Sequence, residues 1–513
     1  MENFVKQILV QSLIIFLALI NVLKAEGLCE KCSCNFKEIT PFIDCSNLNI
    51  ESLDKIAVPR RGLKTRTFDI DFESNQIQEI HKIIPKVSVE RLSFRSNNIS
   101  RIIDGAFSKL VYLSTLDLSH NNLQELTREV FLGPQKPGKG AHSPLLSLDL
   151  SFNRFESFKR TDFEHLFNLE DINFSGNPLQ IVDSHPTSTA IGSLSRLIFL
   201  NLSETGISTL PRHFLKGLLH LQSIDVSKNQ FKVIPSEIHY DGHELKHLKM
   251  DENPIDILKS HSFGNMIALQ TLSLCKMPHL AYIHEAAFSG LRNLTVLKID
   301  NNPDLGFIDP DAFTDFQYPL VLKYLSLSNN FLRYLPENLL PELKNVENAS
   351  LEFFKINGNQ WECNCHNQWL IDLLNHEKFQ DNAKSATCTR PSDLKGVNFL
   401  DAKIEELPCE HKEAFDATKH DFGLPHPSPK FNIGESRIVS LTIALGCILA
   451  IIISVLFVAV LYLKQKRKIT YDRLSGFKIH FQRRETPESI RSSQSSMANS
   501  IYQDNPTTMP VES

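Results

Sequence analysis

The chain has 513 residues, of which 42% are hydrophobic and 22% are charged, so it is long enough to form a large ordered domain. Its formal net charge of -5 at pH 7 is too small to favour a nucleic acid or any other class of partner. Composition excludes little else, and the informative features are where the apolar residues and the cysteines lie along the chain.

Residues 1–25 have the composition of a cleaved signal peptide. Lys6 gives a weakly positive start, an uncharged apolar stretch runs from Ile8 to Val22, and Ala25 is a small residue at a suitable cleavage position. The alternative is an uncleaved membrane anchor, for which the apolar stretch is short. The sequence therefore predicts a protein of the secretory pathway.

Eight of the ten cysteines form two clusters, one in residues 26–62 and one in residues 362–410. The first cluster consists of Cys29, Cys32, Cys34 and Cys45, and the second of Cys363, Cys365, Cys388 and Cys409. In a secreted chain such clusters indicate disulfide bonds, although their spacing does not choose the pairing, and zinc binding is the alternative. Cys275 and Cys447 remain, and Cys275 is expected to be an unpaired thiol because it follows a core leucine.

Between the two clusters, residues 63–361 repeat the pattern L-x-x-L-x-L-x-x-N-x-L about twelve times, as in Leu113–Leu123. Most copies start about 22–29 residues apart, which is the period of leucine-rich repeats. Alternating apolar residues place one short strand per copy with its leucines inward, and stacked copies bury them. We expect an α/β solenoid, a leucine-rich-repeat horseshoe whose two open ends are capped by the cysteine clusters.

Two further positions recur within the copies. Ten copies keep the asparagine, whose amide can satisfy backbone groups of adjacent coils, and seven carry a later phenylalanine that we interpret as a core filler. The asparagines are Asn75, Asn97, Asn121, Asn153, Asn177, Asn229, Asn253, Asn302, Asn330 and Asn359, replaced by Thr205 and Met277 in two copies. The phenylalanines are Phe107, Phe131, Phe163, Phe214, Phe263, Phe288 and Phe313. A Gly- and Pro-rich segment, Gly133–Pro144, is expected to loop out between copies.

The variable positions of the strands form the concave face, where we expect protein binding. This face is predicted to be acidic in its amino-terminal half and basic in its carboxyl-terminal half, which would orient a charged partner. The acidic residues are Asp69, Asp71, Glu73, Asp117, Asp149, Glu170, Asp171 and Asp225. The candidate partner-binding lysines are Lys246, Lys249, Lys276, Lys298, Lys323 and Lys355. Aspartate is a common filler of the repeat, so the lysines carry more of this hypothesis.

Five N-x-S/T sequons precede the predicted span, and we expect them to carry glycans if they are used. They are Asn98, Asn173, Asn201, Asn293 and Asn348. Asn173 and Asn201 occupy middle strand positions, so glycans there would shield the centre of the concave face, although sequons in strands are often used poorly.

His243–His247 matches the H-E-x-x-H motif of zinc proteases. That chemistry needs a helix, because residues four apart must reach one ion. Leu245 is the first leucine of a repeat, so this segment is predicted to run into a strand, where four residues span about 13 Å. We interpret the match as coincidence and predict no enzyme, no metal and no cofactor.

The carboxyl-terminal part predicts a single membrane span. Residues 411–437 are a short stalk, and Ile438–Leu463 has no charge and is long enough to cross a bilayer. Basic residues begin directly at Lys464, which places residues 464–513 in the cytoplasm as a disordered tail. The expected location is the plasma membrane, with type I topology and the amino terminus outside.

Two short patterns in this part have functional interpretations. Gly446, Ala450 and Ser454 form a small-residue stripe that could pair two spans into a homodimer, although small residues are common in spans. Tyr471 and Leu474 fit the tyrosine-based signal read by endocytic adaptors, a pattern that also occurs by chance.

The order of these parts resembles single-span leucine-rich-repeat proteins of the trophoblast-glycoprotein type. The resemblance rests on Leu116–Asn121, on the insertion that ends at Ser143–Leu145, and on Val460–Leu463 followed by basic residues. It implies modulation, by inhibition, of Wnt signalling at the cell surface. The paired caps of extracellular leucine-rich-repeat proteins, which the two clusters resemble, imply disulfides Cys29–Cys34, Cys32–Cys45, Cys363–Cys388 and Cys365–Cys409.

The sequence thus favours a cell-surface glycoprotein that binds an extracellular protein ligand or co-receptor and not a nucleic acid. Two alternatives stay open. A cell or synaptic adhesion protein would act by contact between cells and need little from Tyr471, whereas a co-receptor for a Toll-like receptor would depend on the stripe containing Gly446.

Overall fold

The computed structural model describes residues 31–35, 41–53, 67–81, 83, 88–134, 142–179, 185–314, 321–340, 343, 346–347, 349–379 and 386–402. The chain divides into two units, Met1–Leu424 and Pro425–Ser513, and all described residues belong to the first.

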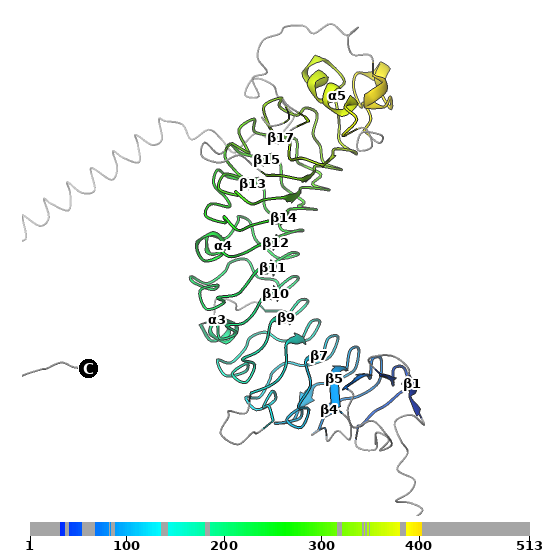
Figure 1. Cartoon of the computed structure of the whole chain (residues 1–513), viewed down its shortest axis with the longest axis vertical. Helices are drawn as coiled ribbons and strands as arrows, with labels where there is room; N and C mark the ends of the chain where they lie inside the picture. Colours follow the sequence, from blue (N-terminus) through cyan, green and yellow to red (C-terminus); the bar gives the residue numbers. More distant parts are fainter. Residues whose placement is uncertain are drawn as a thin grey trace, which may run out of the picture. The chain divides into compact units, whose positions relative to one another are not determined.

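The described part of the first unit is built around one curved sheet of fourteen strands, which lines the concave side of the repeat array (Figure 1). The strands are β1 (Ser33–Asn35), β2 (Phe42–Asp44), β3 (Thr67–Asp71), β5 (Ser88–Ser93), β7 (Thr115–Asp117), β8 (Ser147–Asp149), β9 (Asp171–Asn173), β10 (Phe199–Asn201), β11 (Ser223–Asp225), β12 (His247–Lys249), β14 (Thr271–Ser273), β16 (Val296–Lys298), β18 (Tyr324–Ser326) and β19 (Phe353–Lys355). Only β1 and β2 pair antiparallel, and each later strand pairs in parallel with the strand of the preceding repeat. The twelve strands from β3 onward supply one strand to each predicted repeat.

The connections behind this sheet are mostly turns and very short strands. β4 (Glu79–Ile80) pairs with β6 (Arg101–Ile102), and β13 (Ile257–Leu258), β15 (Tyr282–Ile283) and β17 (Phe307–Ile308) form a three-stranded sheet. Among the described connections between repeats, α-helix occurs in α3 (His185–Gly192) and α4 (Ser236–Asp241), which lie on the side away from the large sheet (Figure 1).

The expectation of an α/β solenoid is therefore wrong in one respect, because the array is a β-solenoid with few helices. The reason is one of spacing. Neighbouring strands lie about 4.8 Å apart, whereas packed helices need about 8–10 Å. Turns and two-residue strands keep the outer side of each coil thin enough to follow the strand spacing.

The core runs as a column between the large sheet and these turns. The strand residue in register with Leu116 is buried in every coil of the array, as Leu116, Leu148 and Ile172 illustrate at no more than 1% exposure. The seven later phenylalanines are buried as well, which confirms their interpretation as core fillers. The ring centroids of Phe263 and Phe288 are 6.0 Å apart, and those of Phe288 and Phe313 are 4.7 Å apart, so these rings stack from coil to coil.

The repeated asparagines join consecutive coils through hydrogen bonds, as predicted. Asn121 Nδ2 donates to Phe94 O of the preceding coil and to Leu118 O of its own coil, each at 3.0 Å, while its Oδ1 accepts from Ile99 N at 2.9 Å. Asn153, Asn177 and Asn229 repeat this arrangement. At the exceptional position Thr205, the hydroxyl donates to Leu202 O and so replaces only the bond within the coil.

Disulfides are present at both ends of the array. Cys32 is bonded to Cys45, and Cys363 is bonded to Cys388, which are two of the expected pairs. The zinc alternative is therefore wrong for these four cysteines. Cys34 and Cys365 are also disulfide-bonded, and their expected partners, Cys29 and Cys409, lie outside the described residues.

The carboxyl-terminal cap covers the last coil with apolar side chains. It contains α5 (Gln368–Asn375) and the 3-10 turns η2 (Cys365–Asn367), η3 (Ser392–Leu394) and η4 (Phe399–Asp401). Trp361, which ends the last repeat, is fully buried, and its ring centroid lies 5.8 Å from that of Phe399. The cap thereby removes from water an apolar end that a solenoid otherwise exposes.

Several predicted segments fall outside the described residues. These are the signal peptide 1–25, the stalk 411–437, the stretch 438–463 with Gly446, Ala450 and Ser454, and the tail with Tyr471 and Leu474. Within the described ranges, no helix combines the length and the apolar character needed to cross a bilayer.

Candidate protein-binding surface

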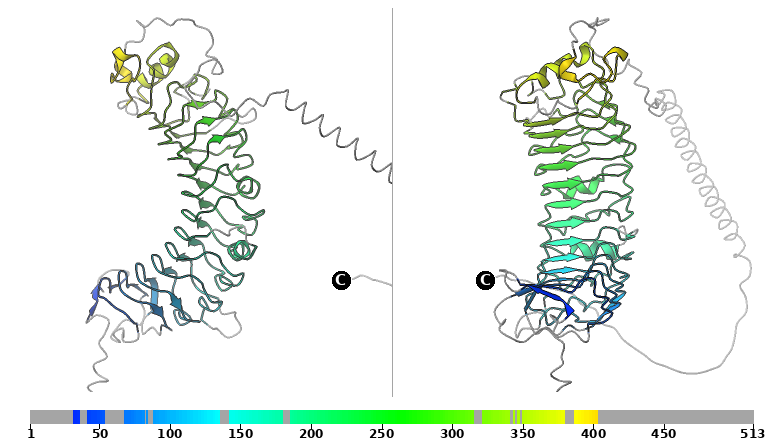
Figure 2. Two further views of the ribbon diagram at one scale, coloured as in Figure 1. Left: turned by 180° about the vertical axis from the view of Figure 1, so that it is seen from behind. Right: turned by 90° about the vertical axis from the view of Figure 1, so that its right-hand side faces the viewer.

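The concave face consists of two rows of side chains that flank the buried centre of each strand. In Figure 2 the strands lie side by side along the array, so residues in register form continuous rows. The first row is Asp69, Arg91, Thr115, Ser147, Asp171, Phe199, Ser223, His247, Thr271, Val296, Tyr324 and Phe353. The second row is Asp71, Ser93, Asp117, Asp149, Asn173, Asn201, Asp225, Lys249, Ser273, Lys298, Ser326 and Lys355.

In the amino-terminal half, the acidic second-row residues hold the backbone where the chain leaves the strand. Asp117 Oδ1 accepts from Ser119 N at 2.8 Å, and Asp149 Oδ1 accepts from Ser151 N at the same distance. Such a bond satisfies an N–H group two residues further on, which is a local turn role for aspartate. The role of these carboxylates is therefore structural, because each one caps a backbone N–H group.

First-row and neighbouring acids in this half have partners of their own. Arg91 Nη1 lies 3.1 Å from Asp69 Oδ2, and Arg95 Nε lies 3.4 Å from Glu73 Oε1. Burial raises the pKa of Asp171, and the nearby charge of Asp149 adds to the effect. The acidic half is thus partly neutralised by the chain itself, which weakens its predicted steering role.

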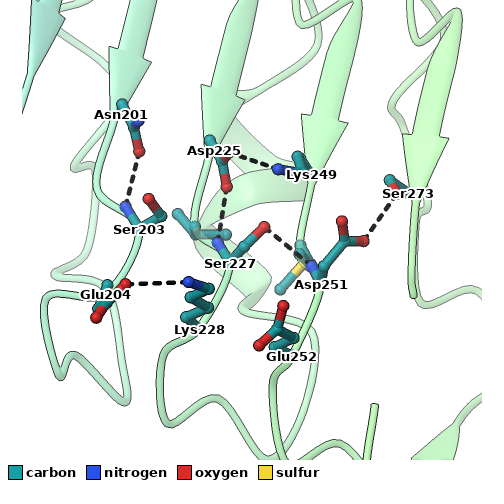
Figure 3. Close-up of polar contacts among 12 residues, drawn as sticks. Asn201, Ser203, Glu204, Asp225, Ser227, Lys228, Lys249, Asp251, Glu252 and Ser273 are labelled. Atoms are coloured by element: carbon teal, nitrogen blue, oxygen red, sulfur yellow. Dashed lines mark hydrogen bonds and ion pairs between the residues drawn. The ribbon is translucent and has the colours of Figure 1, made fainter. Parts of the chain in front are cut away.

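In the carboxyl-terminal half, the acceptor for the same N–H group comes from the preceding coil. Asp251 Oδ1 accepts from Ser273 Oγ at 2.7 Å (Figure 3). The same oxygen accepts from Cys275 N at 2.8 Å. Asp300 Oδ1 accepts from Ser328 N at 2.8 Å in the same way. The second-row residues of these two coils are Ser273 and Ser326, which therefore do not supply the cap themselves.

The preceding coil also supplies the acceptor after each of the first two second-row lysines. Asp251 N, which follows Lys249, donates to Ser227 Oγ at 3.1 Å (Figure 3). Asp300 N, which follows Lys298, donates to Cys275 Sγ at 3.4 Å. Cys275 is a free thiol, as predicted, and it acts here as an acceptor between coils.

Four of the six candidate lysines have polar partners in neighbouring coils. Lys249 Nζ lies 3.2 Å from Asp225 Oδ2, and the Nζ atoms of Lys276 and Lys323 lie 3.6 Å from Glu252 Oε1 and Glu352 Oε1. Lys246 Nζ donates to Gln222 Oε1 at 3.1 Å. The structure therefore does not present six free positive charges.

Lys298 and Lys355 differ from the other four because they flank an aromatic ring. Their Nζ atoms lie 6.0 Å and 5.4 Å from the ring centroid of Tyr324, and within the described ranges neither has a carboxylate within ion-pair distance. Tyr324 is half-buried, and its ring centroid is 6.0 Å from that of Phe353, which is 49% exposed. We call Lys298, Tyr324, Phe353 and Lys355 the Tyr324 cluster.

Sequence reasoning found the two lysines of this cluster but missed the two aromatic residues. The sequence pattern could have revealed them, because two aromatic residues occupy consecutive positions of a row that otherwise carries mostly small or polar residues. Aromatic rings beside unpaired cations combine apolar area with charge, and such residues dominate the energy of protein interfaces.

One lip of the concave face is formed by the residue that precedes each repeated asparagine. These residues adopt the left-handed conformation, for example His120 at φ 54°, and so does Glu204 at φ 57°, which precedes the replacement Thr205. Their side chains contact the next coil: Lys228 Nζ lies 3.2 Å from Glu204 Oε2 (Figure 3), and the rings of His120 and Phe152 stack at 4.4 Å. The lip is therefore a ladder of coil-to-coil contacts beside the candidate surface.

The sequons divide into two groups. Asn98 and Asn293 are exposed, whereas Asn173 and Asn201 are half-buried in the second row, and Asn348 lies outside the described residues. Oδ1 of Asn173 and Oδ1 of Asn201 accept from Ser175 N and Ser203 N, so both amides replace the capping aspartate. Whether these sites carry glycans stays a prediction.

Two other groups of potential metal ligands do not form an obvious site. His247 begins β12 and His243 precedes that strand, so the segment lacks the helix that the protease motif requires. Glu129, Glu164 and His165 lie close together, but the Arg128 guanidinium already bonds Glu164 and lies 3.9 Å from Glu129. That cluster therefore has its own cation.

Comparison with known proteins supports the repeat assignment. The family model "Leucine rich repeat" matches residues 69–123 and 87–136, and "BspA type Leucine rich repeat region (6 copies)" matches residues 156–295. Mouse Tsukushi is 26% identical over 313 residues, which cover 60% of this chain and 76% of that protein. Chicken keratocan is 29% identical over 227 residues, which cover 42% of this chain and 58% of that protein.

Among solved structures, a chain in the octameric complex of Latrophilin 3, Unc5D and FLRT2 has a TM-score of 0.52 and 19% identity. The match covers 74% of this chain and 98% of that chain, and at this identity it concerns the fold alone. Leucine-rich-repeat models thus match two parts of the repeat array, and the chain is similar in sequence to Tsukushi and keratocan.

Proposed function

We propose that this chain is a single-pass type I glycoprotein of the plasma membrane that binds an extracellular protein through the Tyr324 cluster and thereby damps Wnt signalling. The observation that carries the binding part is the position of Lys298 and Lys355 beside Tyr324, with no carboxylate of the described chain neutralising them. Similarity to leucine-rich-repeat proteins of extracellular type supports the same class of function.

The chemistry of the cluster indicates an acidic partner. Carboxylates of a partner could pair with Lys298 and Lys355, while Tyr324 and Phe353 supply apolar area that the partner covers. Each cation beside a ring is worth about 0.5–1 kcal/mol when exposed and more once water is removed. An acidic strand or loop therefore fits this part of the concave face better than a basic one.

Other features support the choice of the carboxyl-terminal half. In the amino-terminal half the acidic side chains are used as caps and ion pairs, and glycans on Asn173 and Asn201 would shield the centre. Attachment to the membrane through Ile438–Leu463 would keep this face on the outside of the cell.

The Wnt part of the proposal is supported by the resemblance to trophoblast-glycoprotein-like proteins. In this mechanism, the bound partner is a Wnt co-receptor and Tyr471–Leu474 draws the complex into the cell. The same geometry would serve an adhesion protein, so the test must separate the two.

We would express the full chain with a labelling enzyme inserted after the signal peptide and compare Tyr324→Thr with wild type. Threonine occupies the same row at Thr115 and Thr271, so the fold should tolerate it. We expect labelling of Wnt co-receptors to fall at least about tenfold, as for loss of a hot-spot aromatic. Tyr240→Thr is the matched control, because Tyr240 is 70% exposed and lies on α4, away from this face.

A Wnt-responsive reporter in the same cells tests the consequence. Wild-type chain should lower the reporter signal, Tyr324→Thr should restore it, and Tyr471→Ala should restore it while surface levels rise. A silent reporter together with labelling only of proteins on neighbouring cells would contradict the Wnt part and favour adhesion. Equal labelling by Tyr324→Thr and wild type would contradict the binding site itself.

A further inference from the structure

A cavity of about 340 Å³ lies at the junction between the last repeat connection and the carboxyl-terminal cap, outside the concave rows. One wall is formed by Trp369, Asp372 and Leu373, which lie on a single face of α5, and by His376, which directly follows the helix. The opposite wall includes Glu337 and Leu343. Its size is within the range of small-ligand sites.

The cavity combines an apolar interior with an acidic rim. Leu343 and Leu373 are buried, Trp369 is half-buried, and Glu337 and Asp372 are both exposed. An aromatic face and two carboxylates are the groups that hold a cation on an apolar stem.

Hydrogen bonds fix the two key side chains in place. Trp369 Nε1 donates to Leu335 O at 2.9 Å, which holds the indole against the array. Gln368 Nε2 donates to Asp372 Oδ1 at 2.8 Å, which leaves Oδ2 of that carboxylate available. His376 Nδ1 accepts from Lys378 N at 3.3 Å.

One cation of the chain lies near the cavity and does not fill it. Lys378 Nζ donates to Val346 O at 3.2 Å and to Ala349 O at 2.7 Å, so it is held by backbone carbonyls. The described lining of the cavity contains two carboxylates, Glu337 and Asp372, and no lysine or arginine.

We propose that this cavity binds a guanidinium or ammonium group on a short alkyl chain, presented as a basic side chain by a protein partner. The alkyl stem would lie against Leu343 and Leu373 and the cation would lie between Trp369, Glu337 and Asp372. This site is separate from the Tyr324 cluster and binds the opposite charge. The chain would therefore bind acidic groups at the Tyr324 cluster and basic groups at the cavity.

The test uses the full chain and the fluorescence of Trp369. The protein has two tryptophans, and Trp361 is fully buried, so a ligand in the cavity changes the emission of Trp369. The probe is n-butylguanidinium, and n-butylurea is its neutral control of the same shape. We expect saturable quenching by the cation with a Kd of about 1 mM, and at least about fivefold weaker binding of the urea.

Variants assign the charge dependence to named residues. Glu337→Gln with Asp372→Asn should weaken cation binding about fivefold or more, whereas Glu377→Gln, which changes an exposed neighbour outside the cavity, should leave it unchanged. If the double variant loses thermal stability, Glu337→Gln alone gives the comparison, because that side chain is exposed. Equal binding of cation and urea, or binding that survives loss of both carboxylates, overturns the proposal.

A second arm identifies the source of the cation. Acetyl-arginine methylamide, which carries peptide groups on both sides, should bind more tightly than n-butylguanidinium if the site reads a protein side chain. Weaker binding of the arginine derivative overturns the protein-partner part and indicates a free small cation.

Discussion

Single side chains decide which positions of the concave face are free to bind. In the amino-terminal half, Asp117 and Asp149 accept the backbone N–H of their own coil. In the carboxyl-terminal half, Asp251, Cys275 and Asp300 supply the acceptor for the following coil. The N–H groups that follow Lys249 and Lys298 are those of Asp251 and Asp300, and their acceptors, Ser227 Oγ and Cys275 Sγ, lie in the preceding coil. These two second-row positions therefore do not need an aspartate and can carry lysine.

Cys275 should be a slow nucleophile because it is a structural acceptor. Burial raises the pKa of its thiol, so the reactive thiolate is scarce at neutral pH and becomes more abundant as pH rises. We expect alkylation of Cys275 by iodoacetamide at pH 7.4 to be at least about tenfold slower in the folded chain than in urea. Mass spectrometry of the peptide that contains Cys275 measures both rates, and equal rates would show that the thiol is accessible and unshifted.

The asparagine ladder predicts a large and local stability effect. Asn121→Ala removes bonds to Phe94 O, Leu118 O and Ile99 N, all of them buried, and should lower the free energy of unfolding by about 3 kcal/mol. Asn122→Ala is the matched control, because Asn122 is half-exposed and uses its backbone N–H to reach Ile99 O. Urea unfolding followed by circular dichroism gives both values, and similar losses would contradict the ladder.

At the scale of the element, the lip of left-handed residues fixes how one coil sits on the next. Gly176 has φ 68°, and an added Cβ would lie 2.5 Å from the Phe152 ring. Phe152 also stacks on His120, so three successive coils meet through this contact. The glycine is needed for both its conformation and its missing side chain.

Substitution separates these two reasons for glycine. Gly206→Ala should lower the free energy of unfolding by about 1 kcal/mol. Its φ of 78° strains an alanine, but nothing lies within 4 Å of the added Cβ, so no clash is added. Gly176→Ala should lower the free energy of unfolding by about 3 kcal/mol, because the backbone strain at positive φ and the clash with Phe152 add. Phe152→Ala should relieve the clash. In urea unfolding, the double variant Phe152→Ala with Gly176→Ala should therefore lose less free energy of unfolding than the two single variants lose together.

At the scale of the whole molecule, the array is a stack in which each coil contacts its neighbours, so its ends control its stability. The carboxyl-terminal cap seals Trp361 against Phe399 and is closed by Cys363–Cys388. The same cap forms one wall of the cation cavity, so its stability and its binding role are linked.

Loss of the cap disulfide should therefore destabilise the array. Replacing Cys363 and Cys388 by alanine should lower the free energy of unfolding by about 3 kcal/mol, because the two cysteines are 25 positions apart and the unbridged cap gains conformational freedom when unfolded. Thermal unfolding of the variant against wild type measures the loss, with Cys275→Ser as a control that removes a thiol, keeps an acceptor for Asp300 N and leaves every disulfide in place. An unchanged transition would mean that apolar packing alone holds the cap.

The sequence by itself determined the repeat, its twelve copies, the caps and the positions of Lys298 and Lys355. It could do so because strand alternation and the asparagine turn are local patterns that recur at a fixed period. The tertiary structure decided that the coils are nearly free of helix, that four candidate lysines are engaged, and that Tyr324 lies between the other two. It also decided that Cys275 caps Asp300 N. Each of these contacts joins residues of different coils, 22 or more positions apart in the chain, so it exists only once the coils are stacked.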